Sequence, residues 1–394
     1  MISNRGVKRD IMIKQTMGIY IHIPFCVKKC EYCDFLSMTG SDELIENYIK
    51  ALIKEISNYG GTRYVVSTIF FGGGTPSIIE AKHIVSIINT LKETFSVSDK
   101  AEITLEINPG TLTQDKIKVY LSAGINRLSM GLQSANNREL ALLGRIHTYE
   151  EFQAGYEIAR EAGIENINVD LMSGLPEQSV ASWESTLRKV LHLEPEHISA
   201  YGLIIEEKTP FFEKYEKDEI ARQEGEKTEY LPEEKAEREM YYVTEKVLKE
   251  YGYNRYEISN YAKKGYRCQH NVGYWERKDY LGFGLGASSL MEQVRFTNGK
   301  DISLYIEGKG LLQNIEVLSR KEQMEEFMFL GLRMIDGISI EDFETEFACS
   351  YESIFGSVTK ALIEKGLIGQ AEKNIYLTNE GIDVSNYVLA EFLL

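Results

Sequence analysis

Short runs of apolar and β-branched residues alternate, through the first half of the chain, with longer segments whose apolar positions recur at helical spacing. The short runs predict six strands, over residues 18–23, 68–71, 102–107, 127–132, 166–171 and 197–203. Helical spacing between them is clearest at residues 42–59, 80–95 and 149–162. Alternating strands and helices indicate an α/β fold with a parallel sheet. Six such units predict a partial (β/α)6 barrel, whose functional loops follow the C-terminal ends of its strands.

The last quarter of the chain has a different pattern. From about residue 309, helical spacing predicts helices over 320–334, 339–347 and 351–365, and two apolar runs predict a short hairpin at 367–369 and 375–378. Helices followed by a hairpin indicate a small, mainly helical, winged-helix-like domain. We therefore expect an N-terminal extension, the barrel, a connecting region and this C-terminal domain, over residues 1–17, 18–210, 211–308 and 309–394.

Composition and charge exclude some classes of function. The chain has 394 residues, of which 43% are hydrophobic and 26% charged, enough for more than one domain and a substantial core. A net charge of -16 argues against a nucleic-acid partner, because phosphate binding needs a basic surface. The winged-helix-like domain is acidic too, so we expect it to cover the open side of the barrel or to dock a protein. Residues 211–242 are crowded with Glu and Lys, which indicates solvated helices without chemistry of their own.

The sequence indicates a cytoplasmic protein. The first sixteen residues lack the apolar core of a signal peptide, and no stretch is long enough to span a bilayer. Five cysteines in so long a chain do not suggest a disulfide framework. Their clustering favours metal binding in a reducing compartment.

Three of these cysteines, Cys26, Cys30 and Cys33, stand close together after the first predicted strand. The same spacing would place them on one face of a helix, where cysteine behaves as a small core hydrophobe. Pro24 and the charged flanking residues argue against a helix there. A structural zinc ion needs four ligands, and no fourth cysteine stands close by. A four-iron, four-sulfur cluster takes one thiolate per iron, so three thiolates would leave one iron open to a small ligand.

This Cys-x-x-x-Cys-x-x-Cys spacing resembles the loop of the radical S-adenosylmethionine (SAM) superfamily. Residues 20–26 (Tyr-Ile-His-Ile-Pro-Phe-Cys) and 70–76 (Phe-Phe-Gly-Gly-Gly-Thr-Pro) look like the anaerobic coproporphyrinogen-III oxidase (HemN) family and its branch of HemW-type haem chaperones. The resemblance covers nearly the whole chain. It implies a 4Fe-4S cluster held by Cys26, Cys30 and Cys33, with SAM on the open iron. Such a cluster donates an electron to the sulfonium of SAM, which breaks to methionine and a deoxyadenosyl radical.

Polar or glycine-rich residues follow most of the predicted strands. Taken singly, the glycines of residues 72–75 are equally well explained by a tight turn, and the polar residues at 106–109, 131–133 and 170–176 by solvated loops or helix caps. The resemblance implies instead that they bind the amino and ribose hydroxyl groups of SAM, and that the glycine-rich segment 281–289 closes back toward this cofactor. The cofactor-binding residues carried over by resemblance are Tyr20, Tyr32, Gly73, Gly74, Thr75, Glu106, Gln133, Arg145, Asp170, Ile204 and Ser288.

Residues 270–275, His-Asn-Val-Gly-Tyr-Trp, resemble the His-Asn-x-x-Tyr-Trp motif of the HemW branch. This resemblance implies haem binding at His270, and imidazole is a frequent ligand of haem iron. A structural explanation stays open, in which His270 and Asn271 form a hydrogen-bonded turn while Tyr274 and Trp275 pack in the core. Cys268 is either a second haem-reactive group or an incidental thiol.

The residue at position 35 helps to distinguish a coproporphyrinogen dehydrogenase from a haem chaperone. The coproporphyrinogen dehydrogenase motif has a further Cys there, whereas this chain has Phe35 after Asp34, as the HemW branch does. We expect a radical SAM haem chaperone that binds a 4Fe-4S cluster, SAM and haem and delivers haem to acceptor proteins. An electron donor such as flavodoxin or ferredoxin would reduce the cluster, and any membrane association would come through acceptors only.

Two alternatives remain on the sequence alone. The first is an enzyme that acts on a porphyrinogen or haem, so whether the chain catalyses a reaction stays open. The second is a cluster-bearing structural protein that binds neither SAM nor haem.

Overall fold

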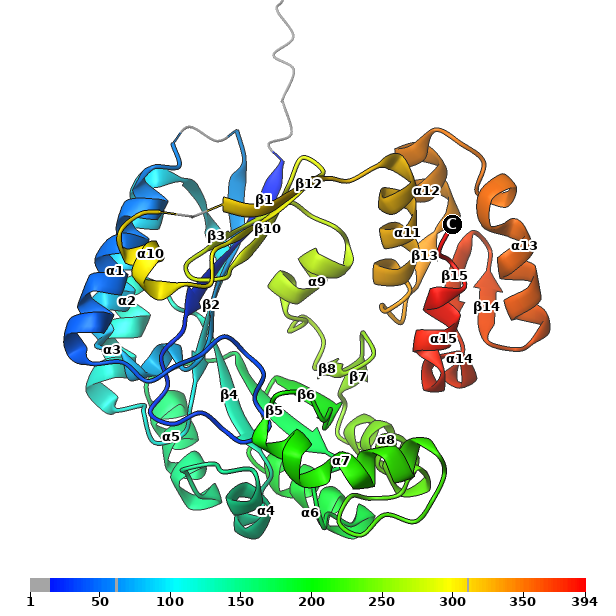
Figure 1. Ribbon diagram of the computed structural model, residues 1–394, viewed down its shortest axis with the longest axis horizontal. Coiled ribbons are helices and arrows are strands. Elements are labelled where there is room, and N and C mark those ends of the chain that lie inside the picture. The colour runs from blue at the N-terminus through cyan, green and yellow to red at the C-terminus, as the bar shows by residue number, and fades with distance from the viewer. Residues whose placement is uncertain (1–14, 61–62, 310–311) are drawn as a thin grey trace, which may run out of the picture.

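The computed structural model describes residues 15–60, 63–309 and 312–394 (Figure 1). Six strands pair side by side in chain order and run parallel. They are β1 (Thr16–Ile23), β2 (Val65–Gly73), β3 (Ser96–Ile107), β4 (Arg127–Gln133), β5 (Ile167–Ser173) and β6 (His197–Gly202). Every predicted strand overlaps one of them, which confirms the partial (β/α)6 barrel. The predicted N-terminal extension lies outside the described residues as far as residue 14.

Helices cover the outer face of the barrel (Figure 1). The first helix begins at Ser41, whose hydroxyl accepts a hydrogen bond from the Leu44 amide and satisfies one of the free N–H groups at the helix start. The helices are α1 (Asp42–Ser57), α2 (Ala81–Thr94), α3 (Gln114–Ala123), α4 (Asn137–Leu142), α5 (Tyr149–Glu161) and α6 (Val180–Leu191), with a short η1 (Pro76–Ile78) after β2. The three helices predicted from spacing end within two residues of α1, α2 and α5.

Successive residues of the barrel strands face two different environments. Ile19 and Ile69 are buried in the main hydrophobic core, between sheet and helices. Their neighbours Tyr20 and Phe70 line a cavity inside the barrel, together with Glu106 of β3. The interior of a closed (β/α)8 barrel is filled by branched apolar side chains. Here the interior is largely polar, and it holds a cavity in which a ligand can bind.

The sheet continues beyond the barrel on both edges, which the sequence did not predict. β9 (Tyr280–Phe283) pairs with β1 in parallel, and β10 (Ser288–Met291), β11 (Val294–Asn298) and β12 (Leu312–Val317) follow it in antiparallel order. On the far edge lie β8 (Asn260–Ala262) and β7 (Asn254–Arg255). These strands are short and lack a clear period of two. β12 falls within the range predicted for the C-terminal domain but belongs to this sheet.

Four helices follow β6, and a separate module ends the chain. The helices are α7 (Pro210–Gln223), α8 (Glu234–Glu250), α9 (Gln269–Trp275) and α10 (Ile302–Ile306). The module consists of α11 (Arg320–Gly331), β13 (Ile338–Ser339), α12 (Ile340–Phe347), α13 (Tyr351–Glu364), β14 (Ile368–Ala371), β15 (Asn374–Leu377), α14 (Asn379–Asp383) and α15 (Ser385–Ala390). Its predicted helices and hairpin are confirmed, whereas α14 and α15 were not expected.

The C-terminal module has its own hydrophobic core and lies beside the open side of the barrel, with α9 between the two (Figure 1). Arg277, which follows α9, forms ion pairs with Glu326 and Glu346 of the module. The Arg333 guanidinium stacks 4.4 Å from the centre of the Trp275 ring. In the described part of the chain, no helix has the length and hydrophobicity that crossing a membrane requires.

Candidate functional site

The three clustered cysteines lie on the loop between β1 and α1, and none of them is in a helix. The interpretation of the three as one face of a core helix is therefore wrong. The Cys26 amide donates a hydrogen bond to the Met38 carbonyl at 2.9 Å, which closes the loop. The Thr75 amide, just after β2, donates to the Phe25 carbonyl at 2.8 Å. The loop is thus fixed to the C-terminal end of the neighbouring strand.

Cys26, Cys30 and Cys33 line one cavity of about 420 Å³. Thr75 Oγ1 lies 3.6 Å from Cys26 Sγ, and burial raises the pKa of the Cys33 thiol. Among the described residues, no three His, Cys, Asp or Glu side chains come close enough together to hold a single metal ion. A structural zinc ion takes four ligands, whereas a 4Fe-4S cluster with one open iron takes three thiolates, which is the number that lines this cavity.

The glycine run at the C-terminal end of β2 lies against the start of the cysteine loop. A Cβ atom on Gly74 would lie 2.9 Å from Cys26 Sγ and 2.7 Å from the Phe25 carbonyl oxygen. Gly73 has a φ of 118°, and a Cβ there would meet the His22 ring at 2.7 Å. Only glycine fits these two positions. The run is therefore needed to bring β2 and the cysteine loop together, and both glycines also line the cavity.

Two carboxyl groups, those of Glu106 and Asp170, face the same cavity as the three cysteines. Glu106, on β3, accepts a hydrogen bond from the Gly73 amide at 3.3 Å. Burial, with Asp170 nearby, raises the pKa of Glu106 to about 8. Asp170, on β5, accepts from Asn168 Nδ2 at 2.8 Å and from Ser129 Oγ at 3.1 Å, and burial raises its pKa as well. A bound cation or hydroxyl group would relieve the cost of holding these carboxyl groups out of water.

Arg145 joins the carboxyl-lined part of the cavity to the cysteines. Its guanidinium donates to Asn108 Oδ1 and to the Gly131 carbonyl, each at 2.5 Å, and reaches Cys30 Sγ at 3.7 Å. Gln133, at the end of β4, adopts a φ of 70° and accepts from the Tyr201 hydroxyl at 3.2 Å. Arg145, Gln133 and the Cys30 thiol therefore share one wall of the cavity.

Nine of the eleven residues carried over for SAM binding line this cavity: Tyr20, Tyr32, Gly73, Gly74, Thr75, Glu106, Gln133, Arg145 and Asp170. Ile204 and Ser288 do not. Ile204 follows β6 and is 69% exposed, and Ser288 is an exposed residue of β10 that pairs with Thr297. The structure adds Asn108, Ser129, Asn168 and Tyr201 to the lining. Each of the last three lies on a strand, two residues from another residue that lines the cavity: Ser129 from Gly131, Asn168 from Asp170 and Tyr201 from Ser199. Residues two apart on a strand face the same side of the sheet, so this spacing would have revealed them.

His270 also lines the cavity, from α9, and only 3% of its surface is exposed. Both ring nitrogens are hydrogen-bonded within the protein, Nδ1 to Thr68 Oγ1 at 2.8 Å and Nε2 to the Tyr274 hydroxyl at 2.9 Å. Its ring stacks on Phe70, with the ring centres 5.1 Å apart. Burial lowers the pKa of His270 to about 3, so the imidazole is neutral. Burial likewise raises the pKa of Cys268 to about 12, which keeps that thiol protonated.

Known proteins resemble this chain over nearly its whole length. Residues 20–190 match the radical SAM superfamily, and residues 318–384 match the HemN C-terminal domain. The haem chaperone HemW of Lactococcus lactis is 35% identical over 97% of this chain and 99% of its own length. HemW of Bacillus subtilis is 36% identical over 95% of this chain and 98% of its own. The chain belongs to the HemW family of radical SAM proteins.

The HemW family shares its fold with a solved enzyme. Coproporphyrinogen III oxidase (HemN) from Escherichia coli, a radical SAM enzyme, superposes with a TM-score of 0.82 over 96% of this chain and 90% of its own, at 24% identity. At that identity the likeness shows the fold alone. Membership of the HemW family agrees with the Asp34-Phe35 pair that follows the last cluster cysteine.

Proposed function

We propose that this protein is a cytoplasmic radical SAM haem chaperone, which binds a 4Fe-4S cluster, SAM and haem and transfers haem to acceptor proteins. The observation that supports this most strongly is the end-to-end match to proteins named haem chaperone, combined with a complete thiol and carboxyl set around one cavity. Cys26, Cys30 and Cys33 would hold the cluster. When bound, the cluster supplies an electron for cleavage of SAM.

The residues of the chain would position SAM and keep water away from it. Glu106 and Asp170 offer acceptors for ammonium and hydroxyl groups. Arg145 places a fixed positive charge at Cys30 and offers its guanidinium to the same end of the cavity. Tyr20, Phe70 and His270 form a wall of stacked rings, with centres 6.3 Å and 5.1 Å apart along the row. Such a wall restricts water inside the barrel.

An electron donor such as flavodoxin or ferredoxin would approach from the cysteine loop. That loop exposes Lys28 and Lys29, which line the mouth of the cavity. In a chain with a net charge of -16, two neighbouring lysines are a local reversal of sign. Complementary charge steers association, so an acidic donor surface would fit here.

His270 can bind haem iron only if one of its hydrogen bonds is broken. Its Nε2 is held by the Tyr274 hydroxyl, which lies one helical turn further along α9. A neutral imidazole is the form that ligates iron. The buried, neutral ring is therefore chemically suitable, and release from Tyr274 would be the step that exposes it to haem.

Haem transfer itself is the experiment that tests the proposal. Haem-loaded protein is mixed with increasing amounts of the apo form of a b-type haem protein, used as a probe, and the change of the Soret band is followed. Direct transfer makes the rate rise with probe concentration. A rate that stays constant would mean that haem only dissociates into solution, and would contradict a transfer function.

A second candidate function is an enzyme that acts on a porphyrinogen. The intact set of Glu106, Gln133, Arg145 and Asp170 around the cavity favours it, because these residues would be needed for productive SAM cleavage. Phe35, 71% exposed at the position of the further Cys, counts against coproporphyrinogen decarboxylation. Deoxyadenosine that forms over many turnovers, and only when a porphyrinogen is present, would establish that the protein is such an enzyme.

A further inference from the structure

A row of hydrogen-bonded side chains joins Asp170 to the start of α9. Asn168 Nδ2 donates to Asp170 Oδ1 at 2.8 Å. Asn168 Oδ1 lies 2.6 Å from His197 Nδ1, and the Tyr256 hydroxyl lies 2.8 Å from His197 Nε2. The same hydroxyl accepts from the amide of Cys268, the residue that directly precedes α9, at 3.3 Å. The row therefore connects a cavity carboxyl group with the helix that carries the haem motif.

The middle of this row is closed to solvent and stands outside the cavity. His197 has no exposed surface, and Tyr256 is 1% exposed. Asn168 and Asp170 line the cavity, whereas His197 and Tyr256 do not. A ligand in the cavity would therefore touch the first two residues only. Any effect of His197 or Tyr256 on ligand binding has to act through their neighbours.

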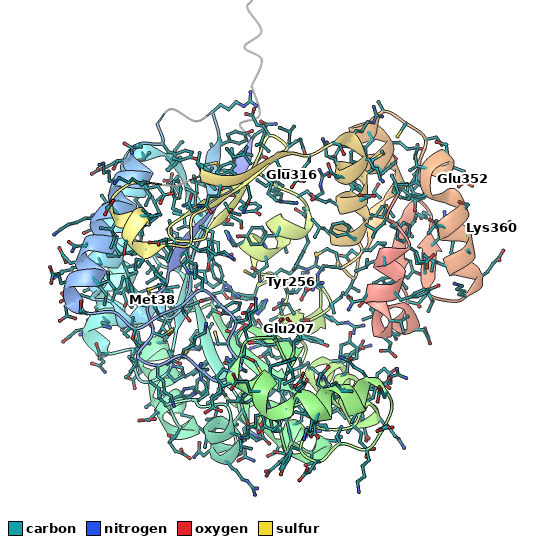
Figure 2. All side chains as sticks on the ribbon, in the orientation of Figure 1. Met38, Glu207, Tyr256, Glu316, Glu352 and Lys360 are labelled. Atoms are coloured by element: carbon teal, nitrogen blue, oxygen red, sulfur yellow. The ribbon has the colours of Figure 1, made fainter. Side chains whose placement is uncertain are left out.

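The strands explain why these residues meet. His197, the first residue of β6, pairs with Asn168 of β5. Asp170 stands two residues further along β5 and faces the same side of the sheet. Tyr256 (labelled in Figure 2) follows β7, and its carbonyl accepts from the Ile335 amide of the C-terminal module at 3.0 Å. The row thus ends where the module is attached to the sheet.

The two ends of the row fix the direction of each hydrogen bond within it. The Cys268 amide can only donate, so the Tyr256 hydroxyl is left to donate its own proton to His197 Nε2. Burial lowers the pKa of His197, so the imidazole is neutral and has one N–H group. Because Nε2 accepts, Nδ1 carries this proton and donates to Asn168 Oδ1. The Asn168 amide then presents its Nδ2 to Asp170 at the other end.

From this arrangement we infer that His197 is a positioning residue for SAM, which acts on Asp170 through Asn168. With the proton on Nδ1, the imidazole holds the Asn168 amide in the orientation that donates to Asp170. The opposite orientation would bring Asn168 Oδ1 against an Asp170 oxygen, and the two acceptors would repel each other. Tyr256 selects the tautomer of His197, because the hydrogen bond at one ring nitrogen decides which nitrogen carries the proton.

Two serine hydroxyls limit the size of the effect. Ser199 Oγ also donates to Asn168 Oδ1, at 3.2 Å, and Ser129 Oγ donates to Asp170 at 3.1 Å. Loss of the His197 contact should therefore weaken SAM binding without abolishing it. The inference rests on the proposed function for the identity of SAM as the ligand at Asp170. The tautomer of His197 follows from the hydrogen bonds alone.

The test uses two variants that each retain one nitrogen position of His197. In His197→Asn the side-chain amide takes the place of Nδ1 and can still donate to Asn168. In His197→Gln the longer amide takes the place of Nε2, so the bond to Asn168 is lost. In anaerobic titrations of cluster-loaded protein, SAM should bind about 5- to 10-fold more weakly to His197→Gln and within about 2-fold of wild type to His197→Asn, as expected for one hydrogen bond.

A purely structural role of His197 predicts the opposite order, because Asn leaves the larger void. Tyr256→Phe removes the donor that selects the tautomer and should also weaken SAM binding. His192→Gln, at an exposed histidine after α6, is the matched control and should leave it unchanged. SAM binding that is equal in the two His197 variants, or weaker in His197→Asn, would overturn the inference.

A second measurement needs no variant. Nitrogen-15 NMR of ligand-free protein with labelled histidine distinguishes a proton on Nδ1 from one on Nε2. The pair Glu196-His197 is the one Glu-His pair in the sequence, which allows the signal to be assigned. We expect the proton on Nδ1, and a proton on Nε2 would overturn the inference even if the variants misfolded. Failure of wild-type protein to bind SAM would count against the proposed function, whereas the tautomer would still test the role of His197.

Discussion

Arg145 Nη1 lies 3.7 Å from Cys30 Sγ, so a fixed positive charge stands beside one of the three clustered thiols. The same guanidinium donates to Asn108 and Gly131. It thereby connects the cysteine loop to the ends of β3 and β4. The contact explains why a residue far from the cysteine motif in sequence is part of the same site.

We therefore predict that Arg145→Met retains the cluster but binds SAM about 10-fold or more weakly, because a charge-assisted contact is lost while all three thiols remain. The reduction midpoint of the cluster should also become more negative, since a nearby positive charge favours the reduced state. Equilibrium SAM binding and a redox titration followed by electron paramagnetic resonance would measure both. Arg138→Met, on the surface at an ion pair with Glu177, should change neither.

The cluster should depend on three cysteines only. Single Cys→Ala changes at Cys26, Cys30 or Cys33 should each abolish a stable 4Fe-4S cluster after anaerobic reconstitution, because each thiolate holds a different iron. Cys268→Ala and Cys349→Ala, whose thiols do not line the cavity, should keep it. Iron and sulfide analysis gives the answer. A full cluster in any of the first three variants would refute the assignment.

Gly74→Ala should displace the cysteine loop. Its added Cβ would lie 2.9 Å from Cys26 Sγ and 2.7 Å from the Phe25 carbonyl oxygen, so the backbone has to move. We expect a loss of roughly 1–3 kcal/mol in the free energy of unfolding and reduced cluster occupancy. Gly60→Ala, where nothing lies within 4 Å of the added Cβ, is the control. Equal occupancy in the two variants would show that the loop tolerates the change.

Glu106 should make the stability of the ligand-free protein depend on pH. Its pKa is raised to about 8 from an ordinary value of 4.5, so between these two values the native state holds a proton that the unfolded state has lost. Stability then falls as pH rises through this range. Replacement by Gln removes the effect, so the free-energy difference between Glu106→Gln and wild type should be small near pH 4.5 and should grow toward pH 8, by a few kcal/mol. Urea unfolding at fixed pH measures it, and parallel stability curves would contradict the prediction.

Haem affinity should respond to the partner of His270. In Tyr274→Phe the imidazole Nε2 loses its hydrogen bond of 2.9 Å, so haem should bind about 3- to 10-fold more tightly, whereas His270→Ala should bind haem weakly and with an altered Soret band. Both variants should retain the cluster. An unchanged spectrum and affinity in His270→Ala would make this histidine structural, and Cys268→Ala would be the next variant to examine.

Much of the site follows from the sequence because its residues stand at the ends of regular strands. The strand containing Glu106 and that containing Asp170 show clear patterns, and parallel strands bring their C-terminal ends to the same edge of a sheet. The cysteine loop was placed for the same reason. Resemblance then supplied the roles of Gly73, Gly74 and Thr75, and the structure adds the steric need for the two glycines.

Other features depend on contacts between distant segments, which no local pattern carries. The hydrogen bonds of His270 to Thr68 and Tyr274 could not be foreseen from its motif. The hydrogen bonds that the Gln269 and His270 amides donate to Glu102 join the start of α9 to β3, which is also far from it in sequence. Ser288 was expected at the cofactor, yet it lies exposed on β10, one of several short strands that the sequence pattern did not predict.

The most direct test of the haem-chaperone account measures 5′-deoxyadenosine formed by anaerobically reconstituted protein with SAM and a reductant. The assay compares protein alone, protein whose Soret band shows bound haem, and protein with coproporphyrinogen III. The account predicts haem bound at a fixed stoichiometry and no additional deoxyadenosine with either tetrapyrrole. Many turnovers of deoxyadenosine that require haem or coproporphyrinogen III would contradict it and would identify the protein as an enzyme.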